Sequence, residues 1–252
     1  MIEQEPRFNP EQNPSREELR AKLKDPNYLP KRAEIHEAFG SDNLFSVDWD
    51  KFCHDKESPV YELLNQEYIQ ALSGYIRSRV NELGGTEDKP VVVLEVGAGN
   101  GRLTHFLVEA LEVDLGDKVK IVATDRKTIV KTFPVEQIEQ AEALKKYNPD
   151  IVISSWMPYE VDFTKNFRDT ESVNEYILIG EPIGGNCGHP WLTWGETQEE
   201  ETDQSPPYAE DGFTMEELDD LSKFQVCRTD RPDQLGEEES HSSTVSFMRV
   251  KE

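Results

Sequence analysis

Apolar side chains recur with a helical period between residues 60 and 83. They form one stripe along a single helix face: Tyr61, Leu64, Tyr68, Leu72, Tyr75 and Ile76. The Gly84-Gly85 pair would end such a helix, because glycine readily adopts the left-handed conformation found after helix C-termini. We therefore predict a helix over residues 60–83 that packs on the core of the protein.

From residue 90 onward, short apolar runs alternate with helical stretches. Residues 91–94 are three valines and a leucine, a run typical of a strand buried on both faces. Further strands are predicted at residues 120–124, 135–138, 151–154 and 176–179, with helices after residue 102 and over residues 141–147. This alternation predicts an α/β fold with a mostly parallel sheet and right-handed crossovers.

The pattern changes again toward the C-terminus. Residues 195–212 are polar, include the acidic run Glu199-Glu200-Glu201, and are predicted to be a surface loop. Thr214 and Glu217 have the spacing of a capping box, which predicts a short helix ending near residue 223. Residues 224–228 and 245–250 are predicted to pair as antiparallel strands at the edge of the sheet.

The first part of the chain has a different character, because prolines divide it into short polar pieces. Ser15 and Glu18 form a capping box for a helix that must end near residue 26, and residues 31–39 are predicted to form a second helix closed by Gly40. Its aromatic residues suggest that this arm docks on the rest of the protein: Phe39, Phe45, Trp49 and Phe52. We predict an arm over residues 1–57, as a structural cover or as a lid, and an α/β domain over residues 58–252 with an acidic loop at about 195–212.

Composition narrows the possible partners. The 252 residues contain 27 Lys and Arg against 51 Asp and Glu, a net charge of −24. Nucleic acids bind through Lys and Arg contacts to phosphates, so we expect no nucleic-acid partner. No apolar run approaches the length of a membrane span, and the acidic N-terminus lacks the apolar stretch of a secretion signal. The three cysteines form no zinc pattern, so we expect an intracellular, cytoplasmic protein without a bound metal or a membrane partner.

A glycine-rich turn follows the strand at residues 91–94. A strand that feeds such a turn and then a helix forms a ligand site in open α/β sheets, because glycine lets the backbone approach the ligand closely. The dinucleotide fingerprint requires glycines at its first, third and sixth positions, here Gly97, Gly99 and Arg102. Arg102 breaks that pattern, and the acidic Glu95 suits a ligand with an ammonium group better than a pyrophosphate. An NAD-dependent oxidoreductase is therefore disfavoured.

The residues from Val93 to Gly101, Val-Leu-Glu-Val-Gly-Ala-Gly-Asn-Gly, closely resemble the first motif of class I S-adenosylmethionine-dependent methyltransferases. The resemblance implies a Rossmann-like, mostly parallel seven-stranded sheet with helices on both faces, an antiparallel strand near the C-terminus and, here, a helical N-terminal extension. It also implies that S-adenosylmethionine is the cofactor. The residues expected around its methionine part are Glu95, Gly97, Ala98, Gly99, Asn100 and Gly101.

Two acids are expected at the rest of the cofactor. In this family an acid that closes the second strand holds the ribose hydroxyls, and Asp125 stands at that position. Hydroxyl groups donate well to a carboxylate, which is the physical reason for an acid there. The next acid of the family meets the adenine amino group, and Glu139 is our candidate. Nearby Glu136 and Glu142 leave open that all three acids simply begin a surface helix.

The methyl acceptor of this family lies beyond the fourth strand. Here Ser155 and Trp156 are expected beside the cofactor, followed by Met157, Pro158 and Tyr159. The sequence is similar to the Asn/Asp-Pro-Pro-aromatic motif of enzymes that methylate amide or amine nitrogens. Trp156 and Met157 replace its first two positions, so methylation of DNA bases or glutamine is not expected. The two rings could accept an apolar or cationic substrate, or could only pack.

A second glycine-rich segment, residues 180–191, follows the fifth strand. It includes Glu181 and His189, and we name these two and Tyr159 as candidate catalytic residues because Glu and His can act as general bases. The alternative for His189 is a role in packing the loop. We therefore predict a methyltransferase that acts on a small molecule or a protein. The competing hypothesis is a catalytically silent binding or scaffold protein of the same fold, with the arm in the acceptor site.

Overall fold

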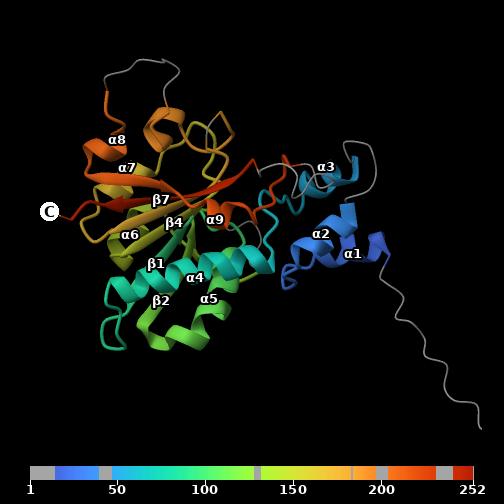
Figure 1. Cartoon of the computed structure of the whole chain (residues 1–252), viewed down its shortest axis with the longest axis horizontal. Coiled ribbons are helices and arrows are strands. Elements are labelled where there is room, and N and C mark those ends of the chain that lie inside the picture. The colour runs from blue at the N-terminus through green and yellow to red at the C-terminus, as the bar shows by residue number, and fades with distance from the viewer. Residues whose placement is uncertain are drawn as a thin grey trace, which may run out of the picture.

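The computed structural model describes residues 15–39, 47–127, 132–182, 184–196, 204–230 and 241–251. At its centre is a seven-stranded sheet in the order β3-β2-β1-β4-β5-β7-β6 (Figure 1). The strands are β1 (Val91–Val96), β2 (Val119–Asp125), β3 (Glu136–Gln137), β4 (Ile151–Ser155), β5 (Glu175–Gly180), β6 (Phe213–Glu217) and β7 (Ser243–Arg249). Only β7 runs against its sheet neighbours. The predicted fold class is confirmed.

The order of the strands reverses at β1. β1 is parallel to both β2 and β4, with Val93 opposite Ile121 on one side and Ile151 on the other. The chain moves outward from β1 to β2 and β3, then returns to β4 on the other side of β1. Helices therefore leave β1 and β4 on opposite faces, and a crevice opens outside the carboxyl ends of these strands.

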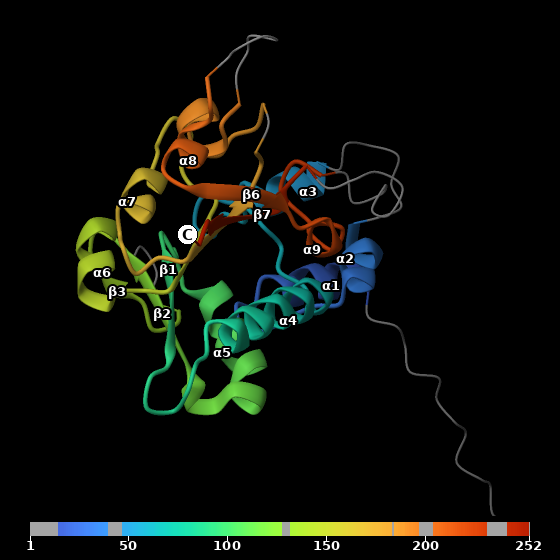
Figure 2. The ribbon, with the colours of Figure 1, turned by 60° about the vertical axis from the view of Figure 1, so that its left-hand side comes forward.

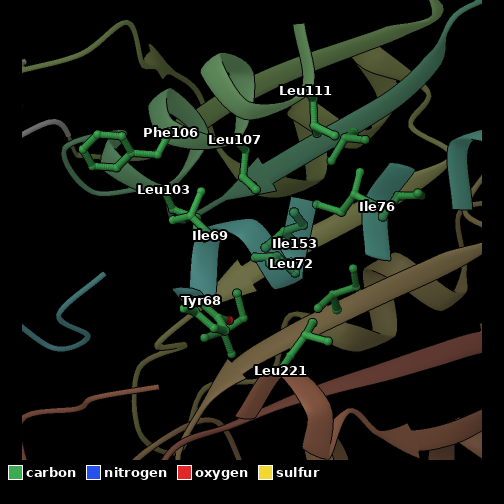
Figure 3. Packing of buried hydrophobic residues seen from close by; sticks show 14 of the residues in the cluster. Tyr68, Ile69, Leu72, Ile76, Leu103, Phe106, Leu107, Leu111, Ile153 and Leu221 are labelled. Atoms are coloured by element: carbon green, nitrogen blue, oxygen red, sulfur yellow. The ribbon is translucent and has the colours of Figure 1, made fainter. Parts of the chain in front are cut away.

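One face of the sheet is covered by α4 (Gln66–Glu82), α5 (Arg102–Leu115) and the short α9 (Asp219–Ser222). Figure 3 shows how their side chains meet those of the sheet: Leu72 and Ile76 of α4 pack with Leu107 of α5 and Ile153 of β4. Burial of such a continuous apolar layer is the main stabilising term for this half of the molecule. A 3₁₀ turn, η1 (Gly116–Lys118), leads from α5 into β2.

The opposite face carries α6 (Gln140–Tyr147), α7 (Thr164–Arg168) and α8 (Pro207–Glu210), as Figure 2 shows. Its core is rich in aromatic rings. Tyr176 of β5 stacks on Phe247 of β7 with ring centres 4.5 Å apart, and Phe167 of α7 packs against the same tyrosine. The prediction of helices on both faces is confirmed. No helix in the described part of the chain is long and apolar enough to cross a membrane.

The N-terminal extension contains α1 (Arg16–Leu23), α2 (Arg32–Phe39) and α3 (Val47–Cys53), which lie together at one end of the molecule (Figure 1). The capping box predicted at Ser15 and Glu18 is confirmed, since each side chain bonds the backbone N–H of the other residue. The helices share a core in which Phe39 meets Trp49 edge-on, at 4.9 Å between ring centres. Leu63 and Val226 complete that core, so the extension is docked. Phe45 and Gly40 lie outside the described residues.

The helix predicted over residues 60–83 begins only at Gln66, so its first six residues were predicted wrongly. Asn65 caps the helix by accepting a hydrogen bond from the Tyr68 N–H at 2.9 Å. The preceding segment is extended and pairs with another part of the chain. The Leu63 N–H donates to the Val226 carbonyl at 2.8 Å, and Glu62 forms a β-bridge with Cys227. Apolar spacing cannot distinguish this extended segment from another helical turn.

The C-terminal prediction was also wrong in two places. Thr214 and Glu217 do not cap a helix but lie in β6, and residues 224–228 form no strand beyond the bridge at Cys227. β6 is an edge strand in which Phe213 is the single buried residue, so it lacks the apolar alternation that marks a strand. The loop predicted over residues 195–212 contains the short helix α8, and its acidic run lies outside the described residues.

Candidate functional site

The glycine loop follows β1 directly and leads into α5. Gly97, Gly99 and Gly101 have φ angles of 69°, 57° and 78°, the left-handed region that glycine adopts without strain. Gly101 is also sterically required, because a Cβ atom there would lie 2.6 Å from Cγ2 of Val135. At Gly97 and Gly99 a Cβ would meet no atom within 4 Å. The loop therefore packs tightly at its end and leaves open space at its beginning.

Glu95 lies under this loop and is almost completely buried. Its Oε2 accepts hydrogen bonds from both the backbone N–H and the hydroxyl of Thr104, in the first turn of α5. Burial raises the pKa of Glu95 to about 7; the two Thr104 bonds oppose that shift and the charge of Asp125 adds to it. A carboxylate that titrates near neutrality would gain its charge readily beside a cationic ligand group.

Asp125 closes β2 and holds the loop from the other side. Its Oδ2 accepts the N–H of Gly99 at 2.9 Å, and its Oδ1 accepts the N–H of Lys127 at 2.7 Å. Each carboxylate oxygen has a second lone pair, so both could still accept a hydrogen bond from a ligand hydroxyl. The structure thus joins the glycine loop and the predicted ribose-binding acid by a direct hydrogen bond.

A cavity of about 380 Å³ lies at the carboxyl ends of β1, β2 and β4, within the size range of small-molecule sites. Five of the residues predicted at the cofactor line it: Gly97, Asp125, Glu139, Ser155 and Trp156. Five others, all in or beside the glycine loop, are not part of its lining: Glu95, Ala98, Gly99, Asn100 and Gly101. The predicted residues therefore lie at one end of the sheet, and their binding roles stay predictions.

The cavity lining mixes charged and apolar groups. Asp125, Arg126, Lys127 and Glu139 supply charged groups, with Arg126 and Glu139 forming an ion pair at 3.7 Å. Apolar lining comes from Ile138, Met157, Val161 and Phe163. Such a cavity suits a ligand that carries both hydroxyl groups and a flat apolar ring. Among the described residues, no group of three His, Cys, Asp or Glu could hold a metal ion.

Trp156 lies at the end of β4 in an unusual backbone conformation, with φ at 53°. Such an angle is strained for a bulky residue and must be enforced by its surroundings. The Trp156 N–H donates to the Ile179 carbonyl at 2.7 Å, and the indole Nε1–H donates to Oε2 of Glu62 at 3.0 Å. The Tyr61 ring lies 5.6 Å from the indole. Sequence reasoning missed Glu62, because it placed that residue inside a helix.

The three candidate catalytic residues are not among the residues that line the cavity. Glu181 is buried and accepts hydrogen bonds from the Asn186 N–H at 3.1 Å and from the Thr229 hydroxyl. His189 precedes the π-helix η2 (Pro190–Trp194), and its Nδ1 accepts the Leu192 N–H at 3.2 Å. Tyr159 is 57% exposed. Their catalytic roles stay predictions.

No family model and no curated protein matches this chain. Among solved structures it is similar to the CurJ carbon methyltransferase (13% identity, 73% of this chain and 54% of that one, TM-score 0.45). It is also similar to the CMeT domain of the citrinin polyketide synthase (14% identity, 75% and 54%, TM-score 0.41). The chain spans about half the length of these two proteins. A third is the plantazolicin methyltransferase BpumL in complex with SAH (9% identity, 94% and 98%, TM-score 0.37).

The sheet itself has the features predicted from the first motif: seven strands, a single antiparallel strand near the C-terminus and helices on both faces. The described strands form a Rossmann-like, mostly parallel sheet. Likeness at 9 to 14% identity concerns the fold alone, because one fold supports many functions. The features that bear on function are the glycine loop, Asp125 and the cavity beside them.

Proposed function

We propose that this protein is a methyltransferase that uses S-adenosylmethionine and acts on a small molecule or a protein. One observation carries the proposal: the glycine loop and Asp125 are hydrogen-bonded to each other at the mouth of a cavity that continues onto an apolar wall. A sulfonium nucleoside without phosphates needs these three elements. They are backbone close to its amino-acid part, an acid at its ribose and apolar surface at its adenine.

Each part of the cofactor would lie against a different part of the cavity and the glycine loop. The methionine part would lie against the loop from Gly97 to Gly101, with Glu95 supplying negative charge beneath it. Asp125 would hold the ribose hydroxyls. Glu139 would accept the adenine amino group, while Ile138 and Phe163 cover the ring. This order follows the chain around the carboxyl edge of the sheet from β1 to β2 and β3.

Methyl transfer is an in-line displacement. A lone pair on the acceptor forms the new bond to the methyl carbon, the carbon–sulfur bond breaks, and its electron pair stays on the neutral thioether product. Alignment of the two reactants and exclusion of water can supply much of the rate enhancement. A general base is needed only where the acceptor carries a proton that it must lose. Glu181, His189 and Tyr159 remain our candidates for that role.

The described part of the arm does not contribute to the cavity that we assign to the cofactor. None of the residues 15–39 or 47–57 lines the cavity. The helices α1, α2 and α3 instead form their own core at the end of the molecule. A lid role for the arm stays a prediction.

Titration calorimetry with S-adenosylmethionine, S-adenosylhomocysteine and NAD tests the proposal. We expect both sulfur compounds to bind and NAD not to bind. Asp125→Asn should weaken binding by about tenfold, because the loss of one charged hydrogen bond costs roughly that much. Asp117→Asn, at an exposed position outside the cavity, is the matched control. Absence of binding of either sulfur compound at millimolar concentration would refute the proposal. Labelled methyl donor and candidate acceptors then test transfer.

A further inference from the structure

Glu62 comes from outside the elements that form the cavity, yet it contacts a residue of the cavity wall. It lies in the extended segment before α4, and its Oε2 accepts the indole N–H of Trp156 at 3.0 Å. Trp156 lines the cavity. This hydrogen bond spans 94 positions of the sequence. It connects two parts of the chain: the extended segment between the arm and α4, and the end of the central strand β4.

The second oxygen of Glu62 is bound to the C-terminal part of the chain. Oε1 accepts the Val226 N–H at 3.2 Å and the Ser242 hydroxyl at 3.2 Å, and the Gln225 amide lies at 3.5 Å. A carboxylate that receives this many donors is fixed in orientation. Burial raises the pKa of Glu62 to about 8, the Trp156, Ser242 and Gln225 bonds lower it, and the charge of Asp230 adds to the rise.

Trp156 needs such external support, because its left-handed backbone costs energy. A bulky residue at positive φ is strained by about 1–3 kcal/mol, and strain of this kind persists only where the surroundings enforce it. Here the backbone N–H is held by Ile179, the indole N–H by Glu62 and one ring face by Tyr61. Of these three contacts, the Glu62 hydrogen bond is the one made by the polar atom of the indole.

We infer that Glu62 is a positioning residue that fixes the indole of Trp156 at the wall of the cavity, and so shapes the binding site for the donor. The inference rests on the proposed function only in naming that ligand. Glu62 does not itself line the cavity. It acts through Trp156, and its loss would leave an indole N–H without an acceptor.

Two substitutions at the same position separate positioning from general stability. Glu62→Ala removes both acceptors. Glu62→Gln keeps one carbonyl oxygen for the indole N–H, and its amide nitrogen replaces the oxygen that now accepts the Val226 N–H. We expect Glu62→Ala to weaken binding of S-adenosylhomocysteine about fivefold, the value of one hydrogen bond. Glu62→Gln should bind within about twofold of the original protein although it unfolds more easily.

A double-mutant cycle tests whether the effect passes through Trp156. In a Trp156→Phe background, which has no indole N–H, Glu62→Ala should change the affinity by less than about twofold. Glu67→Ala is the matched control. Glu67 accepts the Arg32 N–H near the start of α4 and does not line the cavity, so its loss should leave ligand affinity unchanged.

Trp156 fluorescence gives a readout that needs no ligand. The emission spectrum of a protein with Trp156, minus that of the same protein carrying Trp156→Phe, gives the emission of this indole without that of the other three tryptophans. Glu62→Ala should shift that difference spectrum and Glu62→Gln should restore it. If the unsubstituted protein binds no S-adenosylhomocysteine, the proposed function fails. The difference spectrum still tests whether Glu62 positions the Trp156 indole. Unchanged emission in Glu62→Ala, or equal loss of affinity in Ala and Gln variants, would overturn the inference.

Discussion

At the scale of single residues, the loop glycines have different reasons to be glycine. Gly97 lines the cavity and has open space where a side chain would begin, whereas Gly101 is pressed against Val135 and Phe133. Both have positive φ angles. Gly97 therefore keeps space for a ligand, and Gly101 keeps the helix start packed on the segment that follows β2.

Substitution by alanine should separate these two roles. Gly101→Ala should lower the free energy of unfolding by about 2 kcal/mol or more, because backbone strain adds to a clash with Val135. Gly97→Ala should cost about 1 kcal/mol from strain alone, yet weaken S-adenosylhomocysteine binding more than Gly101→Ala does. Urea unfolding and calorimetry measure the two effects. The reverse ranking of stabilities would contradict this account of the loop.

The residues predicted at the site are those whose roles are set by local spacing. The loop from Gly97 to Gly101 and Asp125 at the end of the next strand could be recognised because strand, turn and helix follow one another directly. Glu62 could not be recognised, because its partners lie 94 to 180 positions away. A polar residue within an apolar stripe gives no sign of which distant group it will meet.

At the scale of elements, α5 is fastened to the N-terminal extension at its first residue. The Arg102 guanidinium donates a hydrogen bond to the Tyr28 carbonyl at 2.5 Å and lies over the Phe106 ring at 5.6 Å. Burial lowers the pKa of Arg102 to about 10. Arg102, which breaks the dinucleotide fingerprint, therefore links the start of α5 to the segment between α1 and α2.

Arg102→Met should loosen this attachment while keeping the apolar stem of the side chain. We expect faster amide hydrogen exchange in α1 and α2, by about fivefold for the loss of one hydrogen bond, with exchange in β1 and β4 unchanged. Hydrogen-exchange mass spectrometry measures both. Arg77→Met, which removes a surface ion pair with Asp114, is the control and should leave the exchange of α1 and α2 as it is. Unchanged exchange in Arg102→Met would contradict the attachment.

Elements with a clear apolar pattern in the sequence were predicted well. Elements that depend on contacts with distant parts of the chain were not. The buried strands β1, β4 and β5 stand out because each contains an uninterrupted run of at least three apolar residues. The start of α4 and the edge strand β6 failed for physical reasons. An extended segment beside a helix can continue its apolar stripe, and an edge strand with one buried residue has no alternation to detect.

At the scale of the whole molecule, two acids with raised pKa values, the half-buried Glu62 and the buried Glu95, connect stability to pH. The pKa values of Glu62 and Glu95 are raised from 4.5 to about 8 and about 7. Between pH 4.5 and these values the folded chain holds protons that the unfolded chain has released. These two groups therefore make the protein less stable as pH rises through that window, and their effect levels off above about pH 8.

Urea unfolding at several pH values checks this. The free energy of unfolding should fall between pH 5.5 and 8, by up to about 1.4 kcal/mol per group for each pH unit. Glu62→Gln, which cannot titrate, should flatten the upper part of the curve. A rise in stability over the same range, or an unchanged slope in Glu62→Gln, would show that these acids do not hold their protons in the folded state.

The overall architecture was predictable because alternating strands and helices admit few topologies. The position of the cavity agrees with this architecture, since ligands of such sheets bind at the carboxyl ends of the strands near the strand-order reversal. The contacts of residues 60–65 with residues 225–228 did not follow. Several hydrogen bonds join these two segments, among them the Val226 N–H to Glu62 and the Leu63 N–H to the Val226 carbonyl. No local pattern encodes those contacts.

The outer strand β6 also affects how these molecules behave toward one another in solution. An unpaired strand edge is a template onto which another chain can add, and such growth leads to aggregates. β6 ends in Glu216 and Glu217, both exposed, while the opposite edge strand, β3, is only two residues long. Like charges on approaching copies repel one another, and a short edge offers few hydrogen bonds. Both edges of the sheet therefore resist the addition of a strand from another copy.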